Sequence, residues 1–209
     1  TDYSNPIAID SNCTIEARII DNTSQTGATK SYKVTNIDKV APNQANATVS
    51  SGTLGSNSWY KSNITIRVTA GTDNLSGVNR VTYSLSGATA KGETTITSGG
   101  TFTITAEGTT TITVYTYDNA GNKSSAKTLT VKKDATAPTQ AGVSISSGTP
   151  GYSGWYKSNI GIRVTQGTDS GGSGVNRVVY ALSGAMSKGE TTISNGGTFS
   201  VTAEGTTTI

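Results

Sequence analysis

The chain has 209 residues, of which 14% are charged, and its formal net charge is +3. It has no histidine and one cysteine, which excludes histidine-based catalysis, histidine-ligated zinc and an internal disulfide. No apolar run approaches the roughly 20 residues of a membrane-spanning helix, and the basic residues form no stripe of the kind that binds nucleic acid. We therefore expect no membrane span in this segment and no nucleic-acid partner.

Alternation of apolar and polar residues predicts short strands along the whole chain. Residues 13–42 have the pattern of the final strands of a domain, because they align with 110–138. The middle of the chain predicts seven strands, at 47–49, 62–69, 79–86, 93–97, 101–106, 110–117 and 125–133. In the second of these, Ile64, Ile66 and Val68 share one face, which is typical of a strand with one face on a core. This pattern predicts an all-β sandwich.

A long repeat dominates the sequence. Residues 59–112 and 155–209 are identical at 42 of 54 aligned positions, with one extra residue in the loop that follows Asp169. Self-similarity at a fixed period indicates a tandem array. We predict the C-terminal strands of a preceding repeat at 1–40, a complete repeat at 41–136, and a repeat that lacks its last strands at 137–209. Because the sequence begins with Thr1 and both ends interrupt a repeat, we expect the chain to derive from a longer or processed product.

The order of several short motifs resembles the bacterial Ig-like repeat domains of large surface proteins and adhesins. The motifs are Trp59-Tyr60, Asp73 with Ser76-Gly77-Val78, Glu107-Gly108, Asp118-Asn119-Ala120-Gly121-Asn122, and the linker Asp134-Ala135-Thr136-Ala137-Pro138. Residues 1–40 depart from this pattern, with Asp21-Asn22-Thr23-Ser24 at the fourth motif. The resemblance implies tandem seven-stranded immunoglobulin-like or fibronectin-III-like sandwiches in a linear array. It also implies a stalk, adhesin or fibre on a bacterial surface.

The segment 118–122 has two interpretations. It is typical of a hairpin turn, in which Asp118 accepts backbone N–H bonds and Gly121 supplies a positive φ. It is also a candidate calcium site, because calcium binds carboxylate, amide and carbonyl oxygens. Asp118 and Asp134 would then converge at a domain junction, where Asn119 or Asn122 adds an oxygen, as the resemblance to calcium-stiffened arrays implies. These four residues are the only metal ligands that we predict, and we predict no other cofactor.

Other polar and aromatic residues have simpler interpretations. Asp73 and Asp169 precede Ser-Gly-Val loops and are expected to form turns with local side-chain bonds. Each repeat offers one Glu before Gly, Glu107 or Glu204, whereas a glycosidase needs a pair. We therefore predict no catalytic residues and no enzyme activity. We expect the Trp side chain of each repeat to close the end of a core rather than bind sugar, and Cys13 to be a small buried thiol.

These observations predict a structural stalk or adhesin segment of a secreted bacterial protein at the cell surface, associated with the cell wall. Its expected partners are neighbouring copies or repeats of the same protein, and a host or matrix glycan or protein is a further candidate. One alternative is a subunit of a pilus-like extracellular filament, in which the N-terminal strands of one copy complete the last sandwich of the next. Another is an Ig-like decoration of a phage structural protein.

Overall fold

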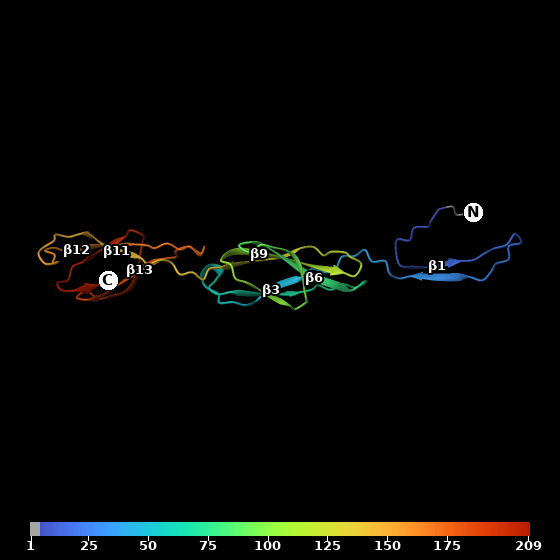
Figure 1. Cartoon of the computed structure of the whole chain (residues 1–209), viewed down its shortest axis with the longest axis horizontal. Helices are drawn as coiled ribbons and strands as arrows, with labels where there is room; N and C mark the ends of the chain where they lie inside the picture. The colour runs from blue at the N-terminus through green and yellow to red at the C-terminus, as the bar shows by residue number, and fades with distance from the viewer. Residues whose placement is uncertain (1–4) are drawn as a thin grey trace. The chain divides into compact units, whose positions relative to one another are not determined.

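The computed structural model describes residues 5–209, and its element order is shown in Figure 1. Residues 1–4, which belong to the predicted segment 1–40, lie outside the described residues. The fold is all-β, with one 3₁₀ turn, η1 (Ser56–Ser58). Within residues 5–209, no helix has the length and apolar character needed to cross a membrane.

Among the described residues, sixteen strands make up five sheets. The strands of the first part of the chain are β1 (Cys13–Ala17), β2 (Lys30–Val34), β3 (Asn46–Ser51), β4 (Trp59–Tyr60), β5 (Ile64–Thr69), β6 (Val78–Gly87), β7 (Lys91–Ile96), β8 (Thr101–Ile104), β9 (Gly108–Asp118) and β10 (Lys127–Lys133). Those of the last part are β11 (Gly142–Ser147), β12 (Ile160–Thr165), β13 (Val178–Gly184), β14 (Lys188–Ile193), β15 (Thr198–Val201) and β16 (Thr207–Thr208). The chain divides into two compact units. Of the described residues, the first unit comprises 5–51, 65–104 and 110–130, and the second comprises 52–64, 105–109 and 131–209.

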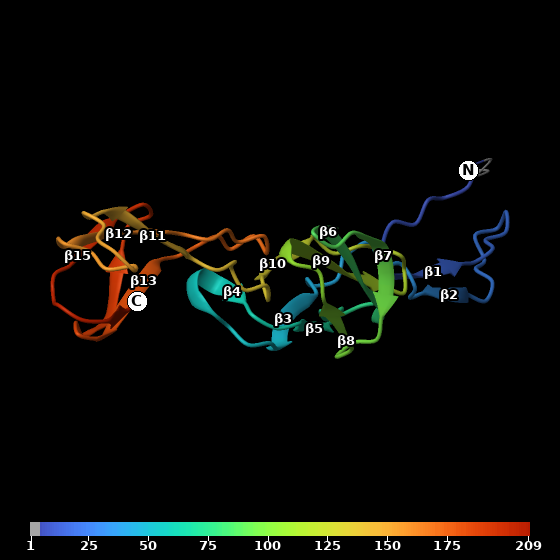
Figure 2. The same cartoon turned by 60° about the vertical axis from the view of Figure 1, so that its left-hand side comes forward.

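Strands from residues 46–133 form two sheets, with orders β3-β5-β8 and β4-β10-β9-β6-β7. Figure 2 shows β3, β5 and β8 in one layer and β6 and β9 in the other. Their alternating apolar residues are buried between the layers, and in the first unit this core comprises Ala47, Ile66, Val68, Val81, Tyr83, Leu85, Ile104, Ile112 and Val114. This arrangement is consistent with a β-sandwich, because each sheet contributes one apolar face to a shared core.

The second unit contains a smaller core between two three-stranded sheets, with orders β11-β12-β15 and β14-β13-β16. Its buried members are Ile162, Val164, Val178 and Val201. Strand β12 pairs Ile162 with Ile145 of β11, and β5 pairs Ile66 with Val49 of β3. Both pairings shift register immediately afterwards. The nearly identical sequences of 59–112 and 155–209 thus form strands with matching registers.

The N-terminal strands β1 and β2 form a separate two-stranded antiparallel sheet, in which Ile15 pairs with Tyr32. Both side chains are exposed. A two-stranded hairpin has no second layer over which to bury a face, so its apolar residues stay in contact with water.

Each of the seven strands predicted between 47 and 133 corresponds to an observed strand, and the predicted core faces are correct. Ile64, Ile66 and Val68 are fully buried, and Ile112 and Val114 are buried in β9. The structure adds β4, two residues that pair in parallel with β10. So short a strand shows no recognisable alternation, because two residues span a single period of the pattern. The all-β class is therefore confirmed, whereas the division into repeats at 40 and 136 stays a prediction.

Candidate metal centre at Asp38, Asp73 and Asp118

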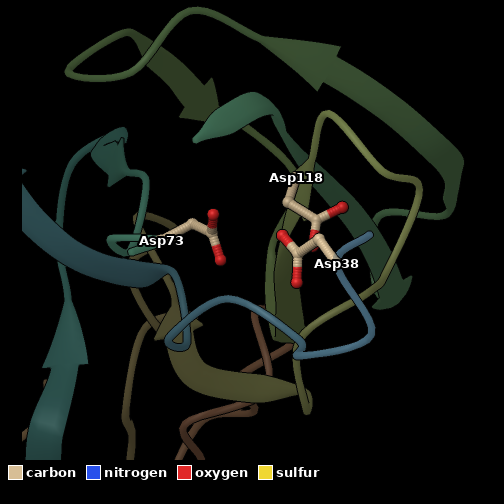
Figure 3. A group of neighbouring side chains, drawn as sticks. All are labelled: Asp38, Asp73 and Asp118. Atoms are coloured by element: carbon tan, nitrogen blue, oxygen red, sulfur yellow. The ribbon is translucent and has the colours of Figure 1, made fainter. Parts of the chain in front are cut away.

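Three carboxylates meet in the first unit. Asp38 lies in the segment between β2 and β3, Asp73 lies in the loop after β5, and Asp118 is the last residue of β9. One oxygen from each lies within 4.8 Å of the others. Figure 3 shows the three side chains approaching one another from these separate segments. We name this group the Asp38–Asp73–Asp118 cluster.

Backbone N–H groups orient two of these carboxylates. Asp73 Oδ2 accepts the N–H of Gly77 at 2.6 Å and that of Leu75 at 3.1 Å, which is the local turn that the sequence predicts. Asp38 Oδ2 accepts the N–H of Ser76 at 2.9 Å, so the same loop also holds the carboxylate of Asp38. The Ser76 side chain, and then the N–H of Val40, hold the pKa of Asp38 below its ordinary value.

Asp118 is the most buried member of the cluster, with 1% of its surface exposed. Its Oδ1 accepts the N–H of Asn122 at 2.8 Å, and its Oδ2 accepts the Nδ2 group of the same residue at 2.8 Å. Gly121 has a φ of 94°, which an L-residue adopts only at a cost. The predicted hairpin turn at 118–122 is therefore confirmed.

The four predicted calcium ligands lie in different surroundings. Asn122 directs its amide nitrogen, rather than its oxygen, at Asp118 and at the carbonyls of Asp38 and Val40. Asn119 instead donates to the carbonyl of Ser76. Its side-chain oxygen accepts the amide of Asn79. Asp134 belongs to the second unit. The structure groups Asp118 with Asp38 and Asp73, and a calcium ion shared by Asp118 and Asp134 stays a prediction.

The second unit repeats the hydrogen bonds of the cluster with two carboxylates. Asp134 Oδ2 accepts the N–H of Ser173 at 2.9 Å, and Asp169 Oδ2 accepts the N–H of Gly174 at 2.7 Å. The Ser173 side chain is the largest cause that lowers the pKa of Asp134. Asp169 Oδ1 is buried and accepts no hydrogen bond. The sequence contains a signal for this pairing, because Asp134 and Asp169 lie 96 residues after Asp38 and Asp73. Each turn considered alone does not show it.

The cluster has the chemistry of a site for a hard cation. Among residues 5–209, no Lys or Arg forms an ion pair with any of its three carboxylates. Like charges at this distance oppose one another unless a proton or a cation lies between them. Carboxylate oxygens that accept one N–H keep further lone pairs for a metal. Asp38, Asp73 and Asp118 are thus the residues that could hold calcium or a similar ion.

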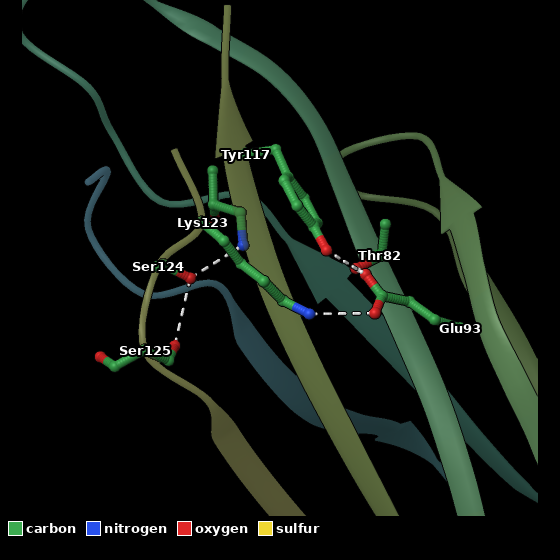
Figure 4. Close-up of polar contacts among 7 residues, drawn as sticks. Thr82, Glu93, Tyr117, Lys123, Ser124 and Ser125 are labelled. Carbon is green, nitrogen blue, oxygen red and sulfur yellow. Dashed lines mark hydrogen bonds and ion pairs between the residues drawn. The ribbon is translucent and has the colours of Figure 1, made fainter. Parts of the chain in front are cut away.

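A second polar group covers the outer face of β6, β7 and β9. Figure 4 shows Thr82, Tyr117 and Lys123 converging on Glu93. Glu93 Oε1 accepts the hydroxyls of Tyr117 at 2.7 Å and Thr82 at 2.8 Å. Its Oε2 lies 3.0 Å from Lys123 Nζ, which also lies 3.6 Å from the centre of the Tyr115 ring. Tyr117 is the largest cause that lowers the pKa of Glu93 to about 2. This group ties three strands together, and the sequence does not reveal it because its members lie far apart along the chain.

The structure also shows the surroundings of the Trp residues, Cys13 and Glu107, for which the sequence made predictions. Trp59 is half-buried, but Trp155 is 68% exposed, so the prediction that each Trp closes a core is wrong for the second. Cys13 is half-exposed rather than buried. Glu107 accepts the backbone N–H of Ala135 at 3.0 Å, which is a structural contact.

No protein-family model matches this chain, and no curated protein matches it. The resemblance to bacterial Ig-like repeats therefore rests on the quoted motifs and their order.

Proposed function

We propose that this chain is a structural segment of an extracellular bacterial surface protein, a stalk or adhesin built from Ig-like β-sandwich repeats. One observation carries the proposal: the same strand registers and the same aromatic pair occur twice along the chain. Tyr83 stacks on Phe102 with ring centres 4.1 Å apart, and Tyr180 stacks on Phe199 at the same distance. Repetition of one sandwich adds length, because each repeat buries a core of its own.

The segment around Asp134 supports a mechanical role. The N–H of Asp134 donates to the carbonyl of Tyr60 at 2.9 Å, and its carboxylate accepts the N–H of Ser173. The N–H of Ala135 and the hydroxyl of Thr136 donate to Glu107. A linker with hydrogen bonds to the residues on both sides loses much of the conformational freedom of a free linker. Such a linker suits a protein that holds a binding tip away from the cell.

The proposed partners are neighbouring repeats of the same protein, with a host or matrix glycan or protein as the ligand at a tip. Enzyme activity is not part of the proposal. A calcium ion on the Asp38–Asp73–Asp118 cluster would support the mechanical role by joining the segment before β3 to the loop after β5.

An antibody raised against the purified chain tests this proposal. We expect it to label intact source cells and to detect a polypeptide several times larger than the 21.3 kDa of these residues. Cells that are labelled only after lysis, with the antigen in the soluble interior fraction, would contradict an extracellular stalk. An unrelated cytoplasmic antigen, probed in parallel, reports whether the cells stayed intact.

A further inference from the structure

Glu107 holds the start of the segment that joins β10 to β11, residues 134–141. It lies directly before β9, where Gly108 turns the chain with a φ of 106°. Its Oε1 accepts the N–H of Ala135 at 3.0 Å, and its Oε2 accepts the hydroxyl of Thr136 at 2.8 Å. The same Oε1 lies 3.7 Å from Lys133 Nζ. One carboxylate thus contacts three donor groups at the end of β10 and just after it.

The buried Lys133 side chain makes this arrangement depend on the charge of Glu107. Lys133 has a side chain that is 7% exposed, and Glu107 is its only ion-pair partner among residues 5–209. A buried ammonium without a counter-charge is unfavourable, so Lys133 favours the ionised form of Glu107. Lys133 is also the last residue of β10, where it pairs with Tyr60 of β4. The ion pair therefore links the end of β10 to the turn before β9.

Asp134 holds the same segment through separate hydrogen bonds. Its Oδ1 accepts the N–H of Thr136 at 3.0 Å, and its Oδ2 accepts the N–H of Ser173 at 2.9 Å. Its own N–H donates to the carbonyl of Tyr60 at 2.9 Å. The N–H of Ala135 therefore reports the state of the Glu107 carboxylate, whereas the N–H of Thr136 reports that of Asp134.

Protonation would remove the features by which Glu107 holds its three partners. A carboxylate accepts hydrogen bonds at both oxygens, whereas a carboxylic acid uses one of them as an O–H donor. Hydrogen bonds to a charged acceptor are also roughly twice as strong as those between neutral groups. A neutral Glu107 would therefore bind Ala135 and Thr136 more weakly, and it would leave the Lys133 ammonium without a counter-charge.

We propose that Glu107 is an acid-released latch, whose carboxylate fixes residues 135–136 at neutral pH and whose protonation frees them. The charged groups that face it among residues 5–209 are Lys133 and Asp134. The Thr136 hydroxyl, and then the Ala135 N–H, hold the pKa of Glu107 below its ordinary value of 4.5. Lys133 lowers this pKa further, and Asp134 opposes the shift. Because the folded pKa is lowered, the latch is fully closed above about pH 4.5 and opens as the pH falls through the lowered pKa.

The latch would control the stiffness of the segment between β10 and β11. All of its groups belong to the second unit. When it opens, residues 135–136 regain backbone freedom that their hydrogen bonds to Glu107 had removed. The use of this freedom to soften a stalk in acid rests on the proposed function, whereas the latch itself does not. A failed latch would leave the antibody test of the proposed function unaffected.

Nuclear magnetic resonance of the isotope-labelled chain tests the latch during a pH titration. The side-chain carboxyl signals of Glu107 and Asp134 give the two pKa values separately, and relaxation of the Ala135 amide gives its order parameter. We expect this order parameter to fall from about 0.85 to below about 0.6 as Glu107 takes up its proton. Core methyl signals, such as those of Ile64, should stay unchanged through this step and show that the sandwich is intact.

Three variants separate the latch from a general effect of acid. Glu107→Gln mimics the protonated form, so its Ala135 amide should already be mobile near neutral pH. Thr136→Val removes the largest cause of the lowered pKa, so Glu107 should titrate closer to 4.5 and the loss of order should move to higher pH with it. Glu190→Gln is the matched control, because it removes an exposed carboxylate elsewhere in the second unit and should leave the titration unchanged.

Two results would overturn the proposal. An Ala135 amide that stays ordered after Glu107 is protonated would mean that other contacts fix the segment. A loss of order that follows the titration of Asp134 instead would assign the release to that carboxylate. If the whole chain unfolds before Glu107 is protonated, the comparison of Glu107→Gln with Glu190→Gln near neutral pH decides. Equal order of Ala135 in these two variants would then contradict the latch.

Discussion

The ring of Tyr83 stacks on that of Phe102 with centres 4.1 Å apart and planes 9° apart, which joins β6 to β8 across the two layers of the first unit. Lys91 Nζ donates to the Tyr83 hydroxyl at 2.8 Å, so the polar end of the ring also has a partner. The pair thus combines burial of apolar area with a fixed geometry between the sheets.

Loss of this stack should destabilise the fold. We expect Phe102→Ala to lower the free energy of unfolding by about 2–4 kcal/mol, because it removes a half-buried ring and leaves Tyr83 without its neighbour. Thr103→Ala, on the exposed parity of the same strand, is the control and should change it by less than about 0.5 kcal/mol. Urea denaturation measures both. An equal effect of the two variants would mean that the stack contributes little.

Calcium should stabilise the first unit if the Asp38–Asp73–Asp118 cluster binds it. A ligand at a hundredfold excess over its dissociation constant raises stability by about 2.7 kcal/mol. We therefore expect a higher Tm in calcium than in chelator, measured by calorimetry, and no such difference in Asp73→Asn. Asp10→Asn, an exposed carboxylate paired with Lys39, is the control and should keep the difference.

The same variant distinguishes an ion site from a mutually repelling cluster. Without a bound cation, Asp73→Asn removes one of three neighbouring negative charges and should raise the Tm. A raised Tm in Asp73→Asn, together with no effect of calcium on the wild-type chain, would rule out the metal centre.

The hydrogen bonds of Thr82, Tyr117 and Lys123 to Glu93 should make the stability of the fold depend on pH. The pKa of Glu93 is lowered from 4.5 to about 2, so the folded state favours the carboxylate. This contribution is fully present above about pH 4.5 and is lost as the pH falls through about 2. We expect Glu93→Gln to be less stable than the wild-type chain near neutral pH and equally stable near pH 2, measured by urea unfolding.

Glu190 provides a matched control for Glu93. It occupies the corresponding position in the last repeat, but its only ion-pair partner among residues 5–209 is Arg177, at 4.0 Å. Both side chains are largely exposed there, where ion pairs contribute little. Glu190→Gln should therefore show almost no difference at any pH. A pH-dependent loss as large as that of Glu93→Gln would contradict the role of Tyr117 and Thr82.

The stability of the fold around the buried Lys133 side chain should depend on its ion pair with Glu107. Its ammonium is buried, and its ion pair with Glu107 is 3.7 Å long. Glu107→Gln keeps the shape of the side chain but leaves the buried Lys133 ammonium without this carboxylate. The free energy of unfolding should therefore fall by about 1–3 kcal/mol. Glu204→Gln, at the corresponding exposed position, should be neutral. In the double variant Glu107→Gln, Lys133→Met, stability should largely return, and chemical denaturation that shows no recovery would contradict this pairing.

The sequence predicts the local elements of this protein well. Alternation with a period of two places Ile64, Ile66 and Val68 on the buried face, and Asp118 followed by Gly121 predicts the turn. Both features depend on neighbouring residues only. The exposure of Trp155 could not be predicted from its own segment, because burial depends on strands that pack over it from elsewhere.

The all-β class, the strands, their core faces and the turns follow from the amino-acid sequence, because side-chain alternation and positive-φ glycines act over a few residues. Which carboxylates meet depends on the tertiary fold. Asp38, Asp73 and Asp118 are 35 and 45 residues apart along the chain, and they converge because β6 pairs with β9 and brings the loop before it to the end of β9.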